Sequence, residues 1–307
     1  MTKLTAEFVK KLLPVRLSNS HKGDYGHTLV VAGSKQFTGA AILCSLGCLR
    51  SGSGLTTIAM PSSLNVQITK RLPPEVMTIY LPDNEGYISP TATKIILDFS
   101  SQRKITSIAF GCGISTEPSA RIFTERFLVK NKVSIVIDAD GLNNIQKNVN
   151  VLKKLKSDTI VTPHPAELSR LMKISISDIQ KNREKITKKF AAEYGLICIL
   201  KGFETVISDG KDIFVNTTGN PGMATGGSGD VLTGMIAGFI GQTRLTARLA
   251  AKLAVGRTKT LLDAACLGVY LHGLAGDFAA KEKTQISMLP TDLIEKIPEA
   301  IKAVRSS

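Results

Sequence analysis

The chain of 307 residues contains no tryptophan, and aromatic side chains make up only 5% of it. Proteins that bind single-stranded nucleic acid usually stack the bases on aromatic side chains set among basic ones. No stretch of the sequence interleaves aromatic and basic residues in this way. We therefore predict that the protein does not bind nucleic acid.

Long apolar stretches are also missing. The sequence has no run of about 18 uncharged apolar residues, the length that crosses a bilayer. The first segment, residues 1–13, carries Lys3, Glu7, Lys10 and Lys11 among its apolar residues, unlike the continuous hydrophobic core of a signal peptide. We therefore expect neither a membrane span nor secretion.

Cysteine is scarce, and its spacing matches no common metal motif. The five cysteines form no CxxC pair and have no histidine at the spacing of a zinc site. Most of them lie inside apolar runs, where a free thiol behaves as a small core residue. They are Cys44, Cys48, Cys112, Cys198 and Cys266. This pattern predicts a reduced, cytoplasmic protein.

Acidic residues are fewer than basic ones, 25 against 39, which gives a formal net charge of +14. A surplus of this size attracts anionic partners. An anionic small-molecule substrate would explain the charge, and a basic composition without any function would explain it equally well. The sequence leaves both explanations open.

Short apolar segments alternate with connections long enough to hold a helix. The predicted strands are residues 27–32, 55–60, 75–80, 105–110, 133–137, 159–161 and 197–200. This alternation predicts a single α/β domain over residues 1–307, with a mostly parallel central sheet covered by helices on both faces. Ligands in such folds bind at the carboxyl ends of the strands.

Small and polar residues follow most of these predicted strands. They include Gly33-Ser34, Gly111-Cys112-Gly113, Asp138-Ala139-Asp140, Pro163-His164-Pro165 and Lys201-Gly202. A single turn of this kind is ordinary loop chemistry, but the carboxyl ends of parallel strands meet at one edge of the sheet. We therefore expect a ligand site at this edge.

The glycine-rich stretch Asn220–Asp230 leads directly into a segment, 231–242, whose apolar residues recur with helical periodicity. At a helix N-terminus the free N–H groups and the helix dipole favour an anion, and glycine lets a phosphate approach the main chain. A carboxylate among such donors would repel the anion, so Asp230 needs a separate role. The simplest role is that of a general base.

A simpler interpretation of the same stretch is a flexible helix start with an acidic residue in its first turn, which the dipole also favours. His164 has two interpretations as well. The prolines on either side of it fix the backbone and suggest a substrate contact. A histidine after a strand also commonly bonds to the helix that it precedes.

Carboxylates near the predicted strand ends are candidate metal ligands. Asp138, Asp140 and Asn143 would bind Mg²⁺ through water or contact the substrate, with Glu167 in the outer shell of the metal, because Mg²⁺ prefers carboxylate and phosphate oxygens. Asp140 with Gly141 equally fits a turn and helix cap. Both interpretations stay open at this point.

Five segments together resemble the ADP/ATP-dependent NAD(P)H-hydrate dehydratase family, which has a ribokinase-like fold. They are VIDADGLNNI, VTPHPAELSRL, LKGFETVI, GNPGMATGGSGDVLTGMIAGFI and CLGVYLHGLAGD. The resemblance extends over residues 22–288. TPHPAE and GMATGGSGDVLTG are specific to this family, whereas GxGD alone would fit any ribokinase-like kinase.

This resemblance implies repair of hydrated nicotinamide cofactors, (6S)-NADHX and NADPHX, at the expense of ADP or ATP and with Mg²⁺. The C6 hydroxyl would be phosphorylated and phosphate then eliminated, with Asp230 as the catalytic base. The substrate contacts it implies are Ala40 or Ala41, Gly113, His164 and Asp230. The nucleotide contacts it implies are Lys201, Gly202, Phe203, Glu204 and Thr205, together with Gly227, Ser228 and Gly229.

The resemblance also carries expectations about organisation. Many relatives have an N-terminal epimerase domain that this chain does not show, so we expect the NAD(P)H-hydrate epimerase on a separate chain. Relatives often form homotetramers, and we expect the same here. Residues 243–260 depart from the family pattern and are predicted to be an inserted basic amphipathic helix between a helix ending near Gln242 and one beginning near Leu261.

Two other functions fit parts of the sequence. A ribokinase-like kinase for a vitamin-precursor alcohol would use the same glycine loop and aspartate, but it would release a phosphorylated product, and the TPHPAE segment disfavours it. A non-catalytic nucleotide sensor would not need Asp230 at the helix start. We therefore favour the dehydratase.

Overall fold

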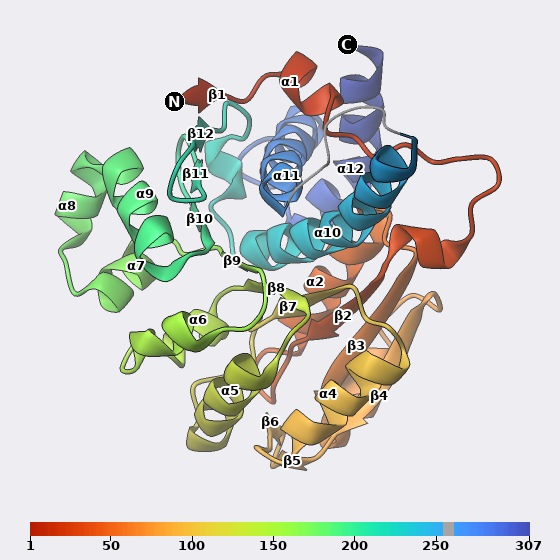
Figure 1. The fold of residues 1–307 in the computed structure, drawn as a ribbon, viewed down its shortest axis with the longest axis vertical. Helices are drawn as coiled ribbons and strands as arrows, with labels where there is room; N and C mark the ends of the chain where they lie inside the picture. Colours follow the sequence, from red (N-terminus) through yellow and green to blue (C-terminus); the bar gives the residue numbers. More distant parts are fainter. Residues whose placement is uncertain (254–260) are drawn as a thin grey trace.

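The computed structural model describes residues 1–253 and 261–307, and for residues 244–253 only the backbone (Figure 1). Its strands are β1 (Thr2–Lys3), β2 (His27–Val31), β3 (Leu55–Pro61), β4 (Val76–Leu81), β5 (Asp83–Asn84), β6 (Tyr87–Ile88), β7 (Ser107–Phe110), β8 (Ser134–Ile137), β9 (Thr159–Val161), β10 (Ile197–Leu200), β11 (Val206–Ser208) and β12 (Ile213–Val215). Its α-helices are α1 (Ala6–Lys10), α2 (Thr38–Arg50), α3 (Asn65–Thr69), α4 (Ala92–Gln102), α5 (Pro118–Lys130), α6 (Asp140–Asn143), α7 (Pro165–Met172), α8 (Ile176–Lys181), α9 (Arg183–Tyr194), α10 (Ser228–Leu253), α11 (Leu261–Lys283) and α12 (Pro290–Ser306).

Ten strands form one sheet in the order β1-β12-β11-β10-β9-β8-β7-β2-β3-β4. Every neighbouring pair from β10 to β4 is parallel, which confirms the predicted α/β class and all the predicted strands. β11 runs antiparallel to both β10 and β12, and β1 pairs with β12 at the edge. These edge strands are too short for their pattern to be recognised in the sequence.

Two apolar cores cover the two faces of the sheet, as period-two side-chain alternation requires. In β8, Val136 belongs to one core, whereas Ile135 and Ile137 belong to the other. Helices α2, α10, α11 and α12 supply the first core, and α4, α5, α7 and α9 supply the second. Figure 1 shows these two groups of helices on opposite sides of the sheet.

The predicted break near Gln242 is wrong, because α10 continues to Leu253 as one helix. The first part of the predicted insertion, 243–260, therefore extends α10 and does not form a helix of its own. Residues 254–260 and the side chains of residues 244–253 lie outside the described part, so the basic amphipathic face stays a prediction. The next helix begins at Leu261 as expected.

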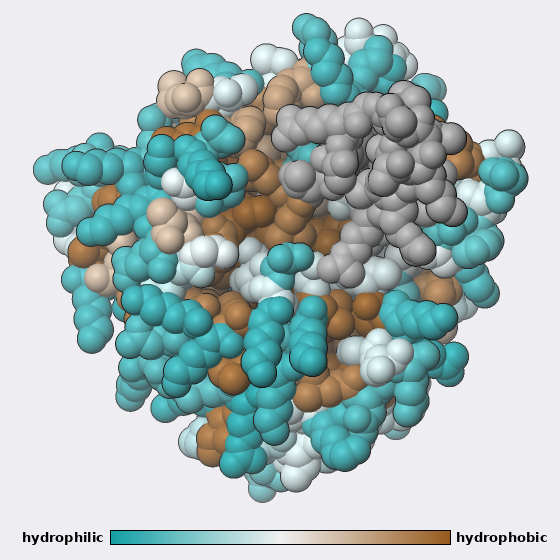
Figure 2. Space-filling model, viewed as in Figure 1, coloured by the Kyte–Doolittle hydropathy of each residue, from teal (hydrophilic) through white to brown (hydrophobic). Residues whose placement is uncertain are grey.

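Among the helices of residues 1–253 and 261–307, none has the combination of length and apolar character that crossing a bilayer requires. Figure 2 shows hydrophilic side chains around α8 and α9 and more hydrophobic ones toward the middle of the same face.

Glycines bring the backbones of α2 and α10 into contact. A methyl group at Gly234 would overlap the carbonyl oxygen of Cys44, and one at Gly47 would lie 2.5 Å from the carbonyl oxygen of Val231. The Cys48 thiol donates a hydrogen bond to the Gly234 carbonyl at 3.1 Å. Helix α10, which begins at the glycine-rich loop, is therefore held rigidly against α2.

Gly234→Ala should lower the free energy of unfolding by about 1–3 kcal/mol, because the added methyl overpacks this contact. Gly39→Ala is the matched control, since a side chain at Gly39 meets no atom within 4 Å. The control should change stability by no more than about 1 kcal/mol. Urea unfolding followed by circular dichroism measures the free energy of unfolding of both variants. An equal loss of stability in Gly234→Ala and Gly39→Ala would contradict the close contact between α2 and α10.

Candidate active site

A buried carboxylate joins three elements at the carboxyl edge of the sheet. Asp138 follows β8 and is only 1% exposed. Its Oδ1 accepts a hydrogen bond from Lys201 Nζ at 2.6 Å, and its Oδ2 accepts one from Thr233 Oγ1 at 2.8 Å. Lys201 follows β10, and Thr233 lies on α10. The ends of two strands and the start of α10 therefore meet around one charge.

Asp230 lies in the first turn of α10, close to this network. Burial and the negative charge of Asp138 raise the pKa of Asp230 to about 6, while a hydrogen bond from the Cys112 thiol and the charge of Lys201 oppose the rise. A general base works best when its pKa is near the operating pH. Asp230 is therefore suited to accept a proton from a bound hydroxyl group.

The Cys112 thiol lies at the predicted sheet edge, but the sequence did not indicate its place next to Asp230. It is fully buried after β7, and its hydrogen bond with Cys44, together with burial, raises its pKa. The thiol therefore stays protonated beside Asp230. The apolar surroundings of Cys112 in the sequence predict a core residue, because no local pattern brings its side chain next to Asp230.

The glycine-rich loop before α10 has the backbone that an anion site needs. Gly227 has φ of 101°, a region that favours glycine, and a side chain there would approach the Leu43 side chain at 2.5 Å. A side chain at Gly229 would lie 3.3 Å from Lys201 Nζ. The N-terminal N–H groups of α10 and the Lys201 ammonium group therefore face one small region.

His272 and Asp277 on α11 hold this loop, although the sequence analysis gave them no role. His272 Nε2 donates to the Ser228 carbonyl at 2.9 Å, and burial lowers the pKa of His272 to about 4, so the ring is neutral. Asp277 accepts hydrogen bonds from Gly219 N at 2.9 Å and Asn220 Nδ2 at 3.0 Å. The only sequence signal was their position in the segment CLGVYLHGLAGD.

His164 caps helix α7, which was one of its two interpretations. Its Nδ1 accepts from the N–H groups of Ala166 at 3.1 Å and Glu167 at 3.3 Å, and Glu167 Oε2 accepts from His164 N at 2.7 Å. The Nε2 edge of the half-exposed ring points toward Glu167 Oε1 at 3.5 Å. The ring remains half-exposed, and its contact with substrate stays a prediction.

The predicted metal ligands are not arranged as a metal site. Both oxygens of Asp138 are occupied, and Asp140 accepts from Ser115 N at 2.9 Å and from Asn143 Nδ2 at 3.1 Å. Glu167 is buried and shares Lys201, 3.9 Å away, with Asp138. Within residues 1–253 and 261–307 no group of three or more His, Cys, Asp and Glu side chains could hold a metal ion. Asp140 is therefore a loop and helix-start residue, and binding of Mg²⁺ through water by Asp138, Asp140 or Glu167 stays a prediction.

The structure also shows that the neighbouring residues Ala40 and Ala41 have different surroundings. A side chain at Gly113 would come within 2.9 Å of Ala40 Cβ, so Gly113 and Ala40 lie side by side. Ala41 is fully buried and packs under Gly33. Of the two alanines, only Ala40 is placed to contact a ligand, and the assignment to Ala41 is corrected.

The loop after β10 contains Lys201, Gly202, Phe203, Glu204 and Thr205. Arg183 Nη2 donates to the carbonyls of Leu200 at 2.9 Å and Lys201 at 3.3 Å, so helix α9 supports the loop from behind. No local pattern in the sequence singles out Arg183. Phe203 is 89% exposed, and an aromatic ring that accessible beside an anion site can stack on a ligand.

A family model and the sequences of known relatives indicate the same protein family. The model of the NAD(P)H-hydrate dehydratase family matches residues 28–299. The ADP-dependent (S)-NAD(P)H-hydrate dehydratase of Bacillus subtilis is 32% identical over 300 residues, which cover 97% of this chain and 97% of that protein. A bifunctional NAD(P)H-hydrate repair enzyme of Moorella thermoacetica is 38% identical over 302 residues, 97% of this chain and 53% of the relative. The chain thus spans about half the length of such bifunctional relatives.

Solved structures show the same likeness. The crystal structure of ADP/ATP-dependent NAD(P)H-hydrate dehydratase from Bacillus subtilis, co-crystallised with ATP/Mg²⁺, has a TM-score of 0.80 at 30% identity and covers 99% of this chain and 98% of that chain. A ribokinase-like superfamily protein from Enterococcus faecalis has a TM-score of 0.81 at 26% identity, covering 100% and 97%. The fold is therefore ribokinase-like.

Cys112→Ala should raise the pKa of Asp230 above about 6, because the carboxylate loses its thiol donor while burial and Asp138 still act on it. Cys198→Ala, which removes another fully buried thiol from β10, is the control and should leave that pKa unchanged. Carboxyl ¹³C chemical shifts followed against pH measure the effect, with Asp230→Asn identifying the signal. An unchanged or lowered pKa in Cys112→Ala would contradict the thiol's role.

Proposed function

The chain belongs to the NAD(P)H-hydrate dehydratase family, and from this premise we propose that it converts (6S)-NADHX and NADPHX to NADH and NADPH with ADP or ATP as co-substrate. The main support is Asp230, a buried carboxyl group with a pKa of about 6 in the first turn of a glycine-led helix. Phosphorylation of a hydroxyl group requires a base to accept its proton and, next to that base, an anion site to stabilise the phosphoryl group.

In the proposed reaction Asp230 removes the proton from the C6 hydroxyl as its oxygen attacks the terminal phosphoryl group of the nucleotide. The N–H groups of Gly227, Ser228 and Gly229 stabilise the charge on that group, which is transferred with release of AMP from ADP or ADP from ATP. The C6–O bond then breaks, a ring proton leaves, and the reduced nicotinamide and inorganic phosphate are formed.

The other site residues fit roles in binding. We propose that Ala40, Gly113 and the Nε2 edge of His164 contact the hydrated nicotinamide. Lys201 supplies a positive charge for phosphate next to Gly229, and the exposed ring of Phe203 offers a face for the adenine base.

In this proposal Mg²⁺ binds to the protein only as a complex with the nucleotide. A Bacillus subtilis relative was co-crystallised with ATP/Mg²⁺. Because Asp138 and Asp140 are already hydrogen-bonded, we propose that Mg²⁺ is held mainly by the nucleotide phosphates and water, as Mg²⁺ commonly is. The chain's residues supply the base and the N–H donors.

The expectations about partners also belong to the proposal. An epimerase on a separate chain would convert the other epimer into the substrate, since bifunctional repair enzymes are among the relatives. A homotetramer and a cytoplasmic location stay predictions. The choice between ADP and ATP, and between NADHX and NADPHX, is open.

Asp230→Asn should lower turnover by about 10²- to 10⁴-fold, because the amide cannot act as a base. Nucleotide affinity should stay the same or increase, since the amide no longer repels phosphate. Return of the reduced-nicotinamide absorbance from NADHX, with Mg²⁺ and ADP or ATP, measures turnover. In the native protein kcat/KM should fall as the pH drops through about 6, where Asp230 becomes protonated.

Asp212→Asn, on the surface between β11 and β12, is the matched control and should keep full activity. Near-native turnover in Asp230→Asn would refute the assignment of the base. A stable phosphorylated product without return of absorbance would instead favour the small-molecule kinase.

Phe203→Ala should raise the KM for ADP and ATP at least about 5-fold with little change in kcat, because loss of base stacking removes about 1–3 kcal/mol of binding. Phe203→Tyr keeps an aromatic face and should bind nucleotide normally. Steady-state kinetics and calorimetry with ADP measure both variants. If the alanine and tyrosine variants bind equally well, the ring does not contact the base.

A further inference from the structure

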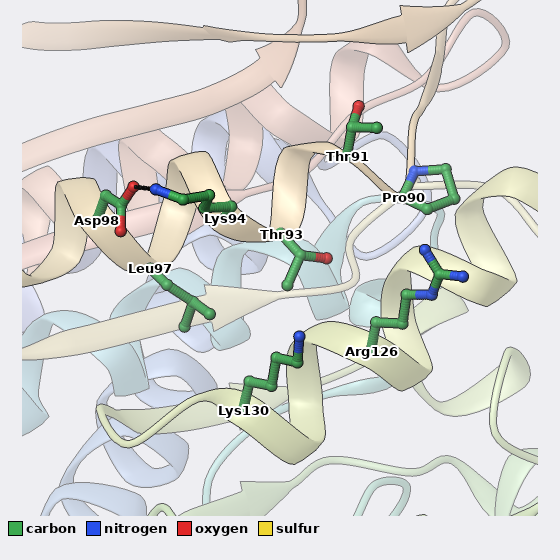
Figure 3. A pocket seen from close by; sticks show the side chains of 8 residues that line it. All are labelled: Pro90, Thr91, Thr93, Lys94, Leu97, Asp98, Arg126 and Lys130. Atoms are coloured by element: carbon green, nitrogen blue, oxygen red, sulfur yellow. Dashed lines mark hydrogen bonds and ion pairs between the residues drawn. The ribbon is translucent and has the colours of Figure 1, made fainter.

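A cavity of about 290 Å³ lies between α4 and α5, helices that cover the sheet face opposite to α10 (Figure 3). Its walls include Pro90, Thr93, Lys94 and Leu97 on the α4 side and Arg126 and Lys130 on the α5 side. None of the residues placed above in the candidate active site lines it. The cavity is therefore a feature that the proposed function does not use.

The charges around this cavity are unbalanced. Asp98 also lines the cavity, and its carboxylate is paired with Lys94 one turn before it on α4, so these two charges cancel. Arg126 and Lys130 are exposed one turn apart on α5, and in the part of the chain that the structure describes neither forms an ion pair. Like charges at this spacing repel each other, and folding brings Lys94 close to them as well. An anion between the helices would remove this repulsion.

A buried hydroxyl group at the same place lacks a partner. Thr93 is 6% exposed, and its Oγ1 forms no hydrogen bond in the described structure. Other buried helix threonines have a partner: Thr124 bonds to the Ala120 carbonyl at 2.7 Å and Thr187 to the Arg183 carbonyl at 2.7 Å. Figure 3 shows the Thr93 side chain directed from α4 toward Arg126 and Lys130.

The start of α4 adds a further positive contribution. The helix has 11 residues, no acidic residue in its first turn and no side-chain cap at Thr91. Its N-terminus, including Pro90, Thr91 and Thr93, forms part of the cavity wall. The positive end of the helix dipole therefore acts on the same space as the cations of α5.

We propose that the α4–α5 cavity is a second anion-binding site, which takes a small ligand carrying a phosphate group. Arg126 presents the planar guanidinium that suits phosphate oxygens, Lys130 and Lys94 add charge, and the Thr93 hydroxyl donates from the base of the cavity. The volume suits a phosphate or a short phosphate ester and is too small for a dinucleotide. The catalytic anion site and this one are independent.

The test is calorimetric titration of the full chain with inorganic phosphate and, in a second arm, with glycerol 3-phosphate. Saturating ADP is present throughout to occupy the glycine loop. We expect saturable binding in at least one arm, and the arm with the tighter binding identifies free phosphate or a phosphate ester as the ligand. The double variant Arg126→Gln/Lys130→Gln should bind at least 10-fold more weakly.

Lys154→Gln/Lys156→Gln removes the same charge from exposed positions elsewhere and should bind like the native chain. Thr93→Val should also weaken binding, yet it should raise the thermal midpoint without phosphate, because it removes a buried hydroxyl that has no partner. The absence of saturable binding in both arms would overturn the proposal. So would equal binding by the Arg126→Gln/Lys130→Gln variant and the native chain.

Discussion

The buried ion pair between Asp138 and Lys201 is the contact on which the arrangement of the active site depends. These residues are 63 positions apart in the sequence, and their 2.6 Å contact joins the ends of β8 and β10. The Thr233 hydroxyl donates a hydrogen bond to the second oxygen of Asp138 and thereby holds α10 at the same point. A buried charge left without its partner is very unfavourable, so these elements are held in one relative position. That position also brings Asp138 close enough to Asp230 to raise the pKa of the proposed base.

The site contains more carboxylates than cations, although the chain as a whole carries a charge of +14. Lys201 serves both Asp138 and Glu167, and burial raises the pKa values of Glu167 and Asp230. These two carboxyl groups therefore retain protons more readily than exposed ones, which reduces repulsion of an incoming phosphate. The basic surplus itself lies elsewhere, in part on the outer helix α5. The sequence left the origin of this surplus open, and the structure shows that it is not concentrated around Asp230.

Rigidity of the anion site comes from the close packing of elements that are distant in the chain. Gly47 and Gly234 let α2 and α10 touch, and this contact positions the first turn of α10 against the strand ends. On the other side, His272 and Asp277 of α11 hold the backbone of the glycine-rich loop by hydrogen bonds. The N–H donors are therefore oriented before a ligand arrives, which is what electrostatic stabilisation of a transferring phosphoryl group requires.

Local sequence patterns specify the α/β class, all the main parallel strands and the position of the glycine-rich helix start, because these depend on local periodicity and on glycine backbone freedom. They also single out Asp230, because the chemistry of a carboxylate among anion donors is local. The packing of distant segments makes Asp138 and Asp140 already hydrogen-bonded, buries Ala41 but not Ala40, and brings the Cys112 thiol next to Asp230. The tertiary structure alone extends α10 past Gln242. These properties depend on distances between residues far apart in the chain, which no local pattern specifies.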